Sequence, residues 1–253
     1  MPRLPRAALA LALCGLLAAC GGGMRPGPGG GPGGGGPPGP GGPGGGYANP
    51  SKVIATDLGF ARAAKDRGQW AAFTEYAARD AVLFEPQPTP AQAWLKGRAN
   101  PPAAVSWQPY SVWSSCDGSL AISQGAWQQA GGLHGRYVTA WARQEDGSYR
   151  WTVTQRGSIA EPLPVPDMLD ARVASCKPLP PASETAGPGA TAERTGISRD
   201  RSLDWSVRND PQCGRVFIAT ISRGPGESRE EVLRLPIAAP ESAGEPSAAA
   251  CPG

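Results

Sequence analysis

The chain has 253 residues, of which 18% are charged and 40% are hydrophobic, and its formal net charge is +3. Two of the positive charges, Arg3 and Arg6, lie in an N-terminal segment that we expect to be removed. A nearly neutral protein lacks the basic face that nucleic-acid binding requires, so we expect no nucleic-acid partner. The single histidine, His134, rules out a histidine-rich metal site, and we expect neither a metal nor a cofactor.

The first 19 residues have the pattern of a signal peptide. Two arginines precede an apolar stretch, residues 7–19, which is shorter than the roughly 20 residues that span a bilayer. The residues Leu17-Ala18-Ala19-Cys20 resemble the lipobox of bacterial lipoproteins. This resemblance implies cleavage before Cys20 and acylation of its thiol, and two or three acyl chains anchor a protein firmly to a membrane. The alternative is an ordinary cleaved signal peptide that ends at a cysteine.

A flexible tether is predicted after the lipidated cysteine, over residues 20–46. Of the 26 residues from 21 to 46, 24 are glycine or proline. Such a segment has no apolar side chains to offset its ordering entropy, and its root-mean-square reach as a coil is about 28 Å. Gly21 replaces the aspartate that is associated with retention in the inner membrane. We therefore expect the protein on the periplasmic face, at the outer rather than the inner membrane.

The remaining cysteines are typical of an exported protein. Cys116, Cys176, Cys213 and Cys251 follow the signal peptide, and none forms a C-x-x-C pair. In an oxidising compartment four cysteines predict disulfides, for which three connectivities are possible. Cys116, Cys176 and Cys213 are the disulfide candidates, whereas Cys251 lies in a predicted disordered tail.

Helical patterns dominate the first part of the folded region. A helix is predicted over residues 50–67, with Ser51 as its cap and Ile54, Leu58 and Ala61 on its apolar stripe. We expect three more elements before residue 100: a helix over 69–79, a strand over 81–84 and a short helix over 91–96.

Antiparallel strands are predicted after residue 105. Alternating segments separated by turn residues, such as Asp117-Gly118 and Asp146-Gly147, indicate hairpins. The predicted strands are residues 105–114, 120–129, 134–144 and 149–156. Together with the helices they predict an α+β fold, in which helices pack on one curved antiparallel sheet.

Three motifs in this order carry a resemblance to a known family. Residues 80–84 (DAVLF) follow the helix pair, and residues 135–141 (GRYVTAW) and 146–151 (DGSYRW) lie in the last hairpin. They resemble the nuclear-transport-factor-2-like (NTF2-like) superfamily, and more narrowly its SnoaL-like and DUF4440-type members. The resemblance covers about residues 50–158, within a domain that we place at 47–160. It implies a cone of helices on a bent sheet with a pocket at its wide mouth.

The resemblance does not imply one activity, because NTF2-like proteins include enzymes, binding domains and dimerisation modules. Related proteins carry an aspartate late in the last strand, whereas this chain has Thr154 and Gln155 after Trp151, and neither is a useful general base. We therefore predict no catalytic residue. The alternative is an isomerase or hydro-lyase with His134 as its base.

A ligand site is predicted at the mouth of the cone. Ligand sites are mostly apolar with a few polar groups, and this region is rich in tryptophan. We expect a small apolar ligand to contact Trp94, Tyr110, His134, Tyr137 and Trp141. The competing interpretation is that the tryptophans only pack a core.

The C-terminal part is expected to be an accessory structure. Residues 161–201 form a proline-rich connecting segment, residues 202–237 a small β appendage and residues 238–253 a disordered tail. Strands are predicted over 202–208, 214–223 and 229–237, and three short strands must pack on the first domain to be stable.

The sequence therefore favours a non-enzymatic lipoprotein that binds a small apolar ligand or a protein partner. After the enzyme, the second alternative is a structural module that forms a homodimer through the open face of its sheet.

Overall fold

The computed structural model describes residues 47–84, 87–177, 192–210, 214–224, 227 and 229–237. The predicted signal peptide, tether and tail, together with Cys20, Cys213 and Cys251, lie outside these residues. No helix of the described part combines the length and the apolar character needed to cross a membrane.

The first helix, α1, spans Pro50–Arg67 as predicted, but a different residue caps it. The side chain of Asn49, and not that of Ser51, accepts a hydrogen bond from the backbone N–H of Lys52 at 3.1 Å. Ser51 lies inside the helix, because Pro50 already occupies its first turn, where the missing N–H of proline costs nothing. The helix ends at Gly68, whose φ of 103° suits glycine.

The second helix, α2 (Gln69–Tyr76), is shorter than the predicted 69–79. Ala77 has extended backbone angles and begins strand β1 (Ala77–Phe84), which pairs in parallel with β6 (Tyr149–Ser158). The Arg150 guanidinium also donates to the backbone carbonyls of Glu75 and Ala77 at the end of α2. Pairing with β6 therefore converts the predicted last turn of the helix into strand.

The first sheet has seven strands in the order β2-β1-β6-β5-β4-β3-β7. The strands β3 to β6 form the predicted antiparallel meander, whereas the β1–β6 and β3–β7 pairs are parallel. Irregular register in β3 and between β5 and β6 marks two bulges, which bend strands. The remaining elements of this sheet and the short helix are β2 (Pro88–Pro90), α3 (Ala91–Leu95), β3 (Ser106–Ser114), β4 (Leu120–Gln128), β5 (His134–Arg143) and β7 (Asp170–Val173).

A second sheet of four antiparallel strands has the order β11-β10-β9-β8. Its strands are β8 (Ala192–Ile197), β9 (Leu203–Asp210), β10 (Gly214–Ile221) and β11 (Glu230–Ile237). Three of them match the predicted strands, but β8 and β7 both lie in the segment 161–201 that was predicted to be only a connection. Both are short edge strands. The partner of β7 is β3, 59 positions earlier, so no local pattern indicated β7, whereas β8 forms a hairpin with the following strand β9, in a part of the chain whose composition predicted a linker.

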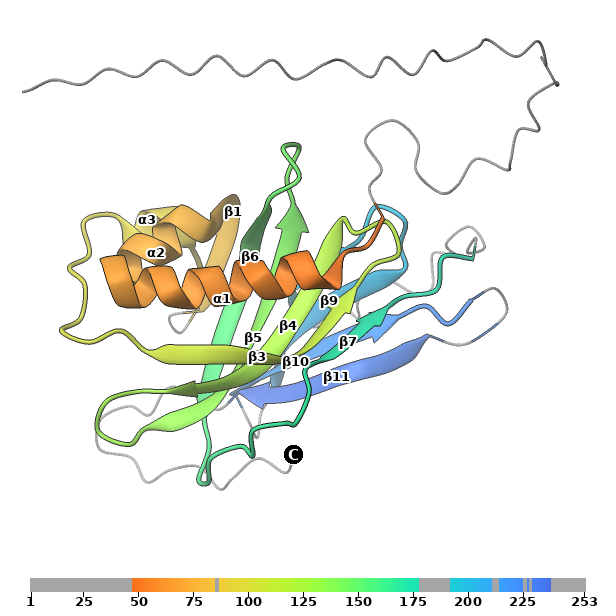
Figure 1. The fold of residues 1–253 in the computed structure, drawn as a ribbon. Coiled ribbons are helices and arrows are strands. Elements are labelled where there is room, and N and C mark those ends of the chain that lie inside the picture. Colours follow the sequence, from red (N-terminus) through yellow and green to blue (C-terminus); the bar gives the residue numbers. More distant parts are fainter. Residues whose placement is uncertain are drawn as a thin grey trace, which may run out of the picture. The chain divides into compact units, whose positions relative to one another are not determined.

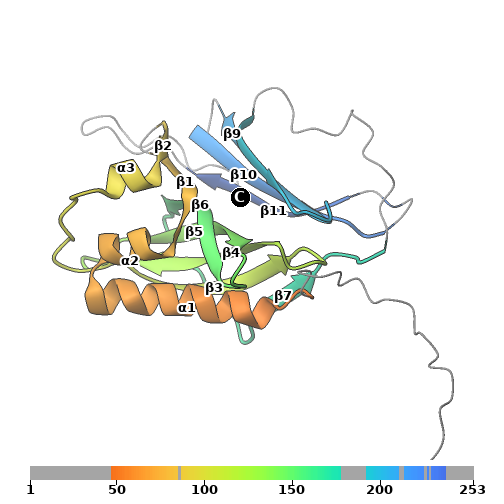
Figure 2. The same cartoon turned by 90° about the horizontal axis from the view of Figure 1, so that it is seen from above.

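The two faces of the first sheet bury two separate hydrophobic clusters. One cluster joins α1, α2 and α3 to the first sheet and includes Phe60, Trp141 and Trp151. The other joins the first sheet to the second and includes Val138, Val153 and Phe217. Figure 2 shows α1 and α2 on one side of strands β3 to β6 and strands β9 to β11 on the other, and α3 beside β1 and β2; Figure 1 shows α1 crossing the same strands. The predicted α+β class is confirmed, and the appendage packs on the first domain as expected.

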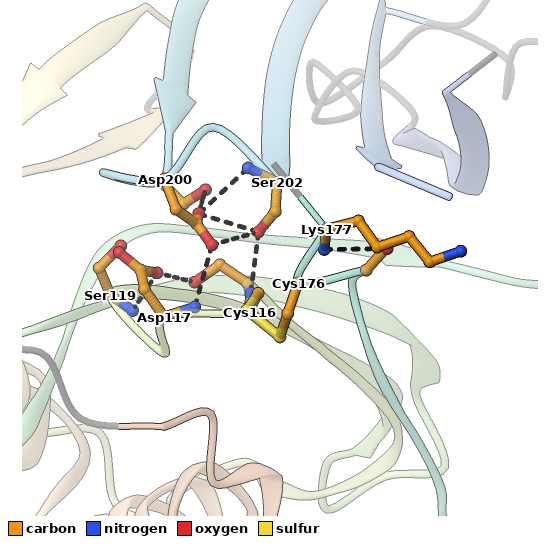
Figure 3. Close-up of a disulfide and its surroundings, with 10 residues drawn as sticks. Cys116, Asp117, Ser119, Cys176, Lys177, Asp200 and Ser202 are labelled. Atoms are coloured by element: carbon orange, nitrogen blue, oxygen red, sulfur yellow. Dashed lines mark hydrogen bonds between the residues drawn. A yellow bond between two sulfur atoms is a disulfide. The ribbon is translucent and has the colours of Figure 1, made fainter. Parts of the chain in front are cut away.

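A disulfide links the turn after β3 to the segment after β7. Cys116 and Cys176 are bonded, with a Cα–Cα distance of 5.0 Å and a sequence separation of 60 (Figure 3). Beside it, the carboxylate of Asp200 accepts hydrogen bonds from the backbone N–H of Asp117 at 3.0 Å and from the hydroxyl of Ser202 at 2.9 Å. Two of the three candidate cysteines are therefore paired, and the hydrogen bonds of Asp200 tie the β3–β4 turn to the second sheet.

Candidate functional site

A carboxyl group lies in the middle of the buried stripe of α1. The buried residues Val53, Asp57, Phe60 and Ala64 recur at spacings of three and four, so they share the face of the helix that packs on the sheet. Asp57 is 0% exposed. The predicted stripe was wrong by one position, because Leu58 is 42% exposed. The buried face of α1 was predicted wrongly because it contains Asp57, and a charged residue type is expected on the exposed face of a helix.

The Asp57 carboxyl receives hydrogen bonds from neighbouring strands of the first sheet. The indole Nε1 of Trp107 in β3 donates to Oδ1 at 2.9 Å, and the hydroxyl of Tyr137 in β5 donates to Oδ2 at 2.8 Å. Ser123 in β4 also forms a side-chain hydrogen bond with Asp57. The Ser123 hydroxyl in turn accepts from Nε1 of Trp141 at 2.9 Å. We call these five residues the Asp57 cluster.

Burial changes the acid–base properties of the cluster. Burial raises the pKa of Asp57 above its ordinary value of 3.8, although the hydrogen bonds from Ser123, Trp107 and Tyr137 oppose the shift. The pKa of Tyr137 is raised well above 10.0, first by burial and then by the charge of Asp57. Tyr137 therefore stays protonated at neutral pH, and its hydroxyl donates a hydrogen bond to Oδ2 of Asp57.

Aromatic rings surround the cluster on the helix side. Phe60 contacts four rings, those of Phe73, Tyr76, Trp107 and Trp141, at centroid distances between 4.8 and 6.1 Å. Trp70 in α2 meets Trp94 in α3 edge to face at 5.1 Å, and the Arg98 guanidinium lies 3.5 Å from the Trp94 ring centroid. Trp70, Phe73 and Trp94 are only partly buried, and we call them the aromatic rim.

The structure brings three of the five predicted ligand-contacting residues together. Tyr137 and Trp141 belong to the Asp57 cluster, and Tyr110 lies close enough to Tyr137 for the two phenols to interact electrostatically. Trp141 is completely buried within the core. Trp94 lies apart from them, at the aromatic rim.

His134 is not part of this cluster. It begins β5 at an even position, so it shares a strand face with Val138, which packs between the two sheets, and not with Tyr137. Its ring Nδ1 lies 2.8 Å from the carbonyl oxygen of Gly132. The hypothesis that His134 is a base inside the cone therefore has no geometric support. Among the described residues, a fully buried acid does lie inside the domain, but it is Asp57, which no sequence pattern indicated.

The described residues contain no group of three or more histidine, cysteine, aspartate or glutamate side chains placed to hold a metal ion.

The face of the first sheet that the homodimer hypothesis required to be open packs against β9 and β10 through residues such as Val207 and Phe217.

Comparisons with known proteins give only distant structural neighbours. No family model matches the sequence, and no curated protein matches it. Eight chains of solved structures match. One is a protein of Parabacteroides distasonis provisionally assigned as a ketosteroid isomerase, with a TM-score of 0.36 and 15% identity over 45% of this chain and 96% of the other. Another, provisionally assigned as an aromatic ring hydroxylase of Novosphingobium aromaticivorans, has a TM-score of 0.32 and 16% identity over 44% and 90%.

Proposed function

We propose that this protein is an exported lipoprotein, held at the periplasmic face of the outer membrane through Cys20, whose NTF2-like domain binds a small apolar ligand without catalysis. A protein partner in place of the small ligand is the other outcome that the proposal admits. The Cys116–Cys176 disulfide supports export, because structural disulfides persist in oxidising compartments.

The aromatic rim is the observation that carries the binding proposal. Trp70, Phe73 and Trp94 are partly exposed, and they border a core of further aromatic rings. Partly exposed aromatic side chains offer large apolar areas at little cost in conformational entropy, which suits a flat apolar ligand. The Arg98 guanidinium over Trp94 adds a cation beside this apolar surface.

Native mass spectrometry of the full chain in detergent, before and after organic extraction, tests binding. We expect an additional small-molecule mass that extraction removes and that Trp94→Ala reduces. Leu133→Ala is the control, because Leu133 is also a large apolar residue but is 57% exposed in the β4–β5 hairpin. A chain that carries no small molecule and is unaltered by Trp94→Ala would contradict the ligand proposal and favour a protein partner.

Metabolic labelling with a radioactive fatty acid tests the anchor. We expect label on the wild-type chain and on Cys14→Ala, and none on Cys20→Ala. The unlabelled variant should also leave the membrane fraction, because in this proposal the lipid on Cys20 is what attaches the wild-type chain to the membrane. Equal labelling of Cys20→Ala would exclude lipidation at this residue.

One observation favours a second candidate function, an isomerase or hydro-lyase that uses Asp57 in place of His134. A buried carboxyl with a raised pKa beside a tyrosine hydroxyl is typical of sites that move protons. A general base works best when its pKa lies near the working pH. Carbon-13 NMR of labelled aspartate therefore tests this candidate: titration of Asp57 between roughly pH 5 and 8 would support it. A carboxyl that keeps one state over that range would leave a structural role.

A further inference from the structure

Polar atoms without partners gather on the face of the first sheet opposite the helices. Six buried side-chain nitrogen or oxygen atoms of the described residues have no hydrogen-bond partner. Four of the six belong to three residues of β5 and β6: Nε2 of His134, Nε of Arg136, and both Nε2 and Oε1 of Gln155. Most buried polar groups in proteins are paired, so this concentration requires an explanation.

The strand register places these three residues on one surface. Gln155 pairs with Val138, and Val138 packs between the two sheets, so Gln155 lies on that same face. His134 and Arg136 are the preceding even positions of β5 and share the face with Val138. Arg136 is diagonal to Gln155 across adjacent strands, a separation of roughly 7 Å that long side chains bridge. We call these three residues the sheet-face polar triad.

Arg136 gives the triad a positive charge that none of the ion pairs among the described residues neutralises. On this face, β4 places Gln124, Ala126 and Gln128 opposite Val138, Arg136 and His134, and none of the three is acidic. A guanidinium that lacks a carboxylate favours an anion, and its Nε–H suits an oxyanion.

The triad also offers two acceptors. Because a carbonyl oxygen can only accept, Nδ1 of His134 donates its hydrogen to the carbonyl oxygen of Gly132, which leaves Nε2 as the nitrogen whose lone pair can accept. The Gln155 amide presents a donor at Nε2 and an acceptor at Oε1, and the residue is 7% exposed. Two donors beside two acceptors match a ligand that has an oxyanion next to a hydrogen-bond donor.

We propose that His134, Arg136 and Gln155 bind a small carboxylate that carries a hydroxyl or similar donor beside its carboxylate group. Arg136 Nε–H and Gln155 Nε2–H hold the carboxylate, while Gln155 Oε1 and His134 Nε2 accept from the neighbouring donor. This site lies on the opposite face of the sheet from the Asp57 cluster, so it is independent of the proposed apolar ligand.

Nitrogen-15 NMR of the full chain in detergent, observing the arginine Nε–H and glutamine side-chain amide signals, tests the proposal. The probes are glycolate, acetate, which lacks the hydroxyl, and inorganic phosphate. We expect glycolate to shift the Arg136 and Gln155 signals saturably, and to bind about tenfold more tightly than acetate through the extra hydrogen bond. His134→Phe should reduce glycolate affinity to that of acetate, because it removes only an acceptor.

Two variants separate ligand binding from a structural role. Arg136→Gln and Gln155→Leu should abolish the saturable shift, whereas Arg62→Gln, at an exposed position of α1, should leave it unchanged. Gln155→Leu should also keep or raise the thermal stability, because it replaces unpaired buried polar atoms with apolar ones of similar size. No saturation by any probe, equal binding of all three probes, or unchanged binding in Gln155→Leu would each overturn the proposal.

Discussion

Asp57 shows how a single side chain can join a helix to a sheet. A carboxyl group at a position that the spacing of α1 assigns to the core is costly to bury, and this cost raises its pKa. Donors from β3, β4 and β5 offset much of the cost, since Trp107, Ser123 and Tyr137 all bond to it. The same hydrogen bonds fix the position of α1 on the strands.

Replacing Asp57 by asparagine should therefore destabilise the protein in a pH-dependent way. At low pH we expect Asp57→Asn to cost about 1–3 kcal/mol, because an amide leaves a donor of the cluster unpaired. Because the pKa of Asp57 is raised, the folded chain binds more protons than the unfolded chain between pH 3.8 and the pKa of the folded state. The contribution of Asp57 to the free energy of unfolding therefore falls as the pH rises through this interval. The deficit of the variant should thus be smaller at neutral pH. Urea unfolding at several pH values, with Asp66→Asn as an exposed control in α1, measures it. A deficit that grows with pH would contradict the raised pKa.

At the scale of elements, local signals and pairing partners compete at every boundary. Where local residues cap both ends of a helix, as Asn49 and Gly68 cap α1, the helix boundaries follow from the sequence. Where a strand partner is available, pairing decides, and α2 ends at Tyr76 because Ala77 pairs with Trp151. The bulge at Tyr110 similarly depends on Gly125, where a Cβ would lie 2.0 Å from the backbone oxygen of Gln108.

The cap of α1 provides a direct test at this scale. Asn49→Ala should lower the free energy of unfolding by about 1 kcal/mol, because the Lys52 N–H loses its acceptor. Ser51→Ala should change it by less than about 0.5 kcal/mol, since Ser51 is exposed within the first turn. Urea unfolding followed by circular dichroism compares the two. A larger effect at Ser51 would restore the capping role that the sequence suggested.

At the scale of the whole folded region, the second sheet acts as part of the core and not as an accessory. Its cluster with the first sheet includes Trp113 from β3 and Phe217 from β10, each at most 6% exposed. The bidentate pair of Arg172 in β7 with Glu230 in β11, at 2.9–3.0 Å, connects the same layers. The Cys116–Cys176 disulfide fixes the segment after β7, where the Ser175 N–H donates to the carbonyl oxygen of Ser222 after β10. We therefore expect the two sheets to unfold together.

Removing the disulfide tests this expectation. The bond closes a loop of 60 residues, so Cys116→Ala/Cys176→Ala should lose about 4 kcal/mol. Tryptophan fluorescence and far-ultraviolet circular dichroism should still report one shared urea transition, at a lower midpoint, because the apolar cluster remains continuous. Two separate transitions would show that the second sheet is an independent unit.

The sequence by itself determined the α+β class, the helices, the four-stranded meander and three strands of the second sheet, because periodicity and turn residues are local properties. It also limited the disulfide to a few candidates. The tertiary structure alone decided that Cys116 pairs with Cys176, that β7 and β8 join sheets, and that Tyr137 and Trp141 meet in the Asp57 cluster while His134 faces the other way. Apart from the β8–β9 hairpin, these pairings join residues 18 to 80 positions apart, and no local pattern records which distant partner a side chain meets.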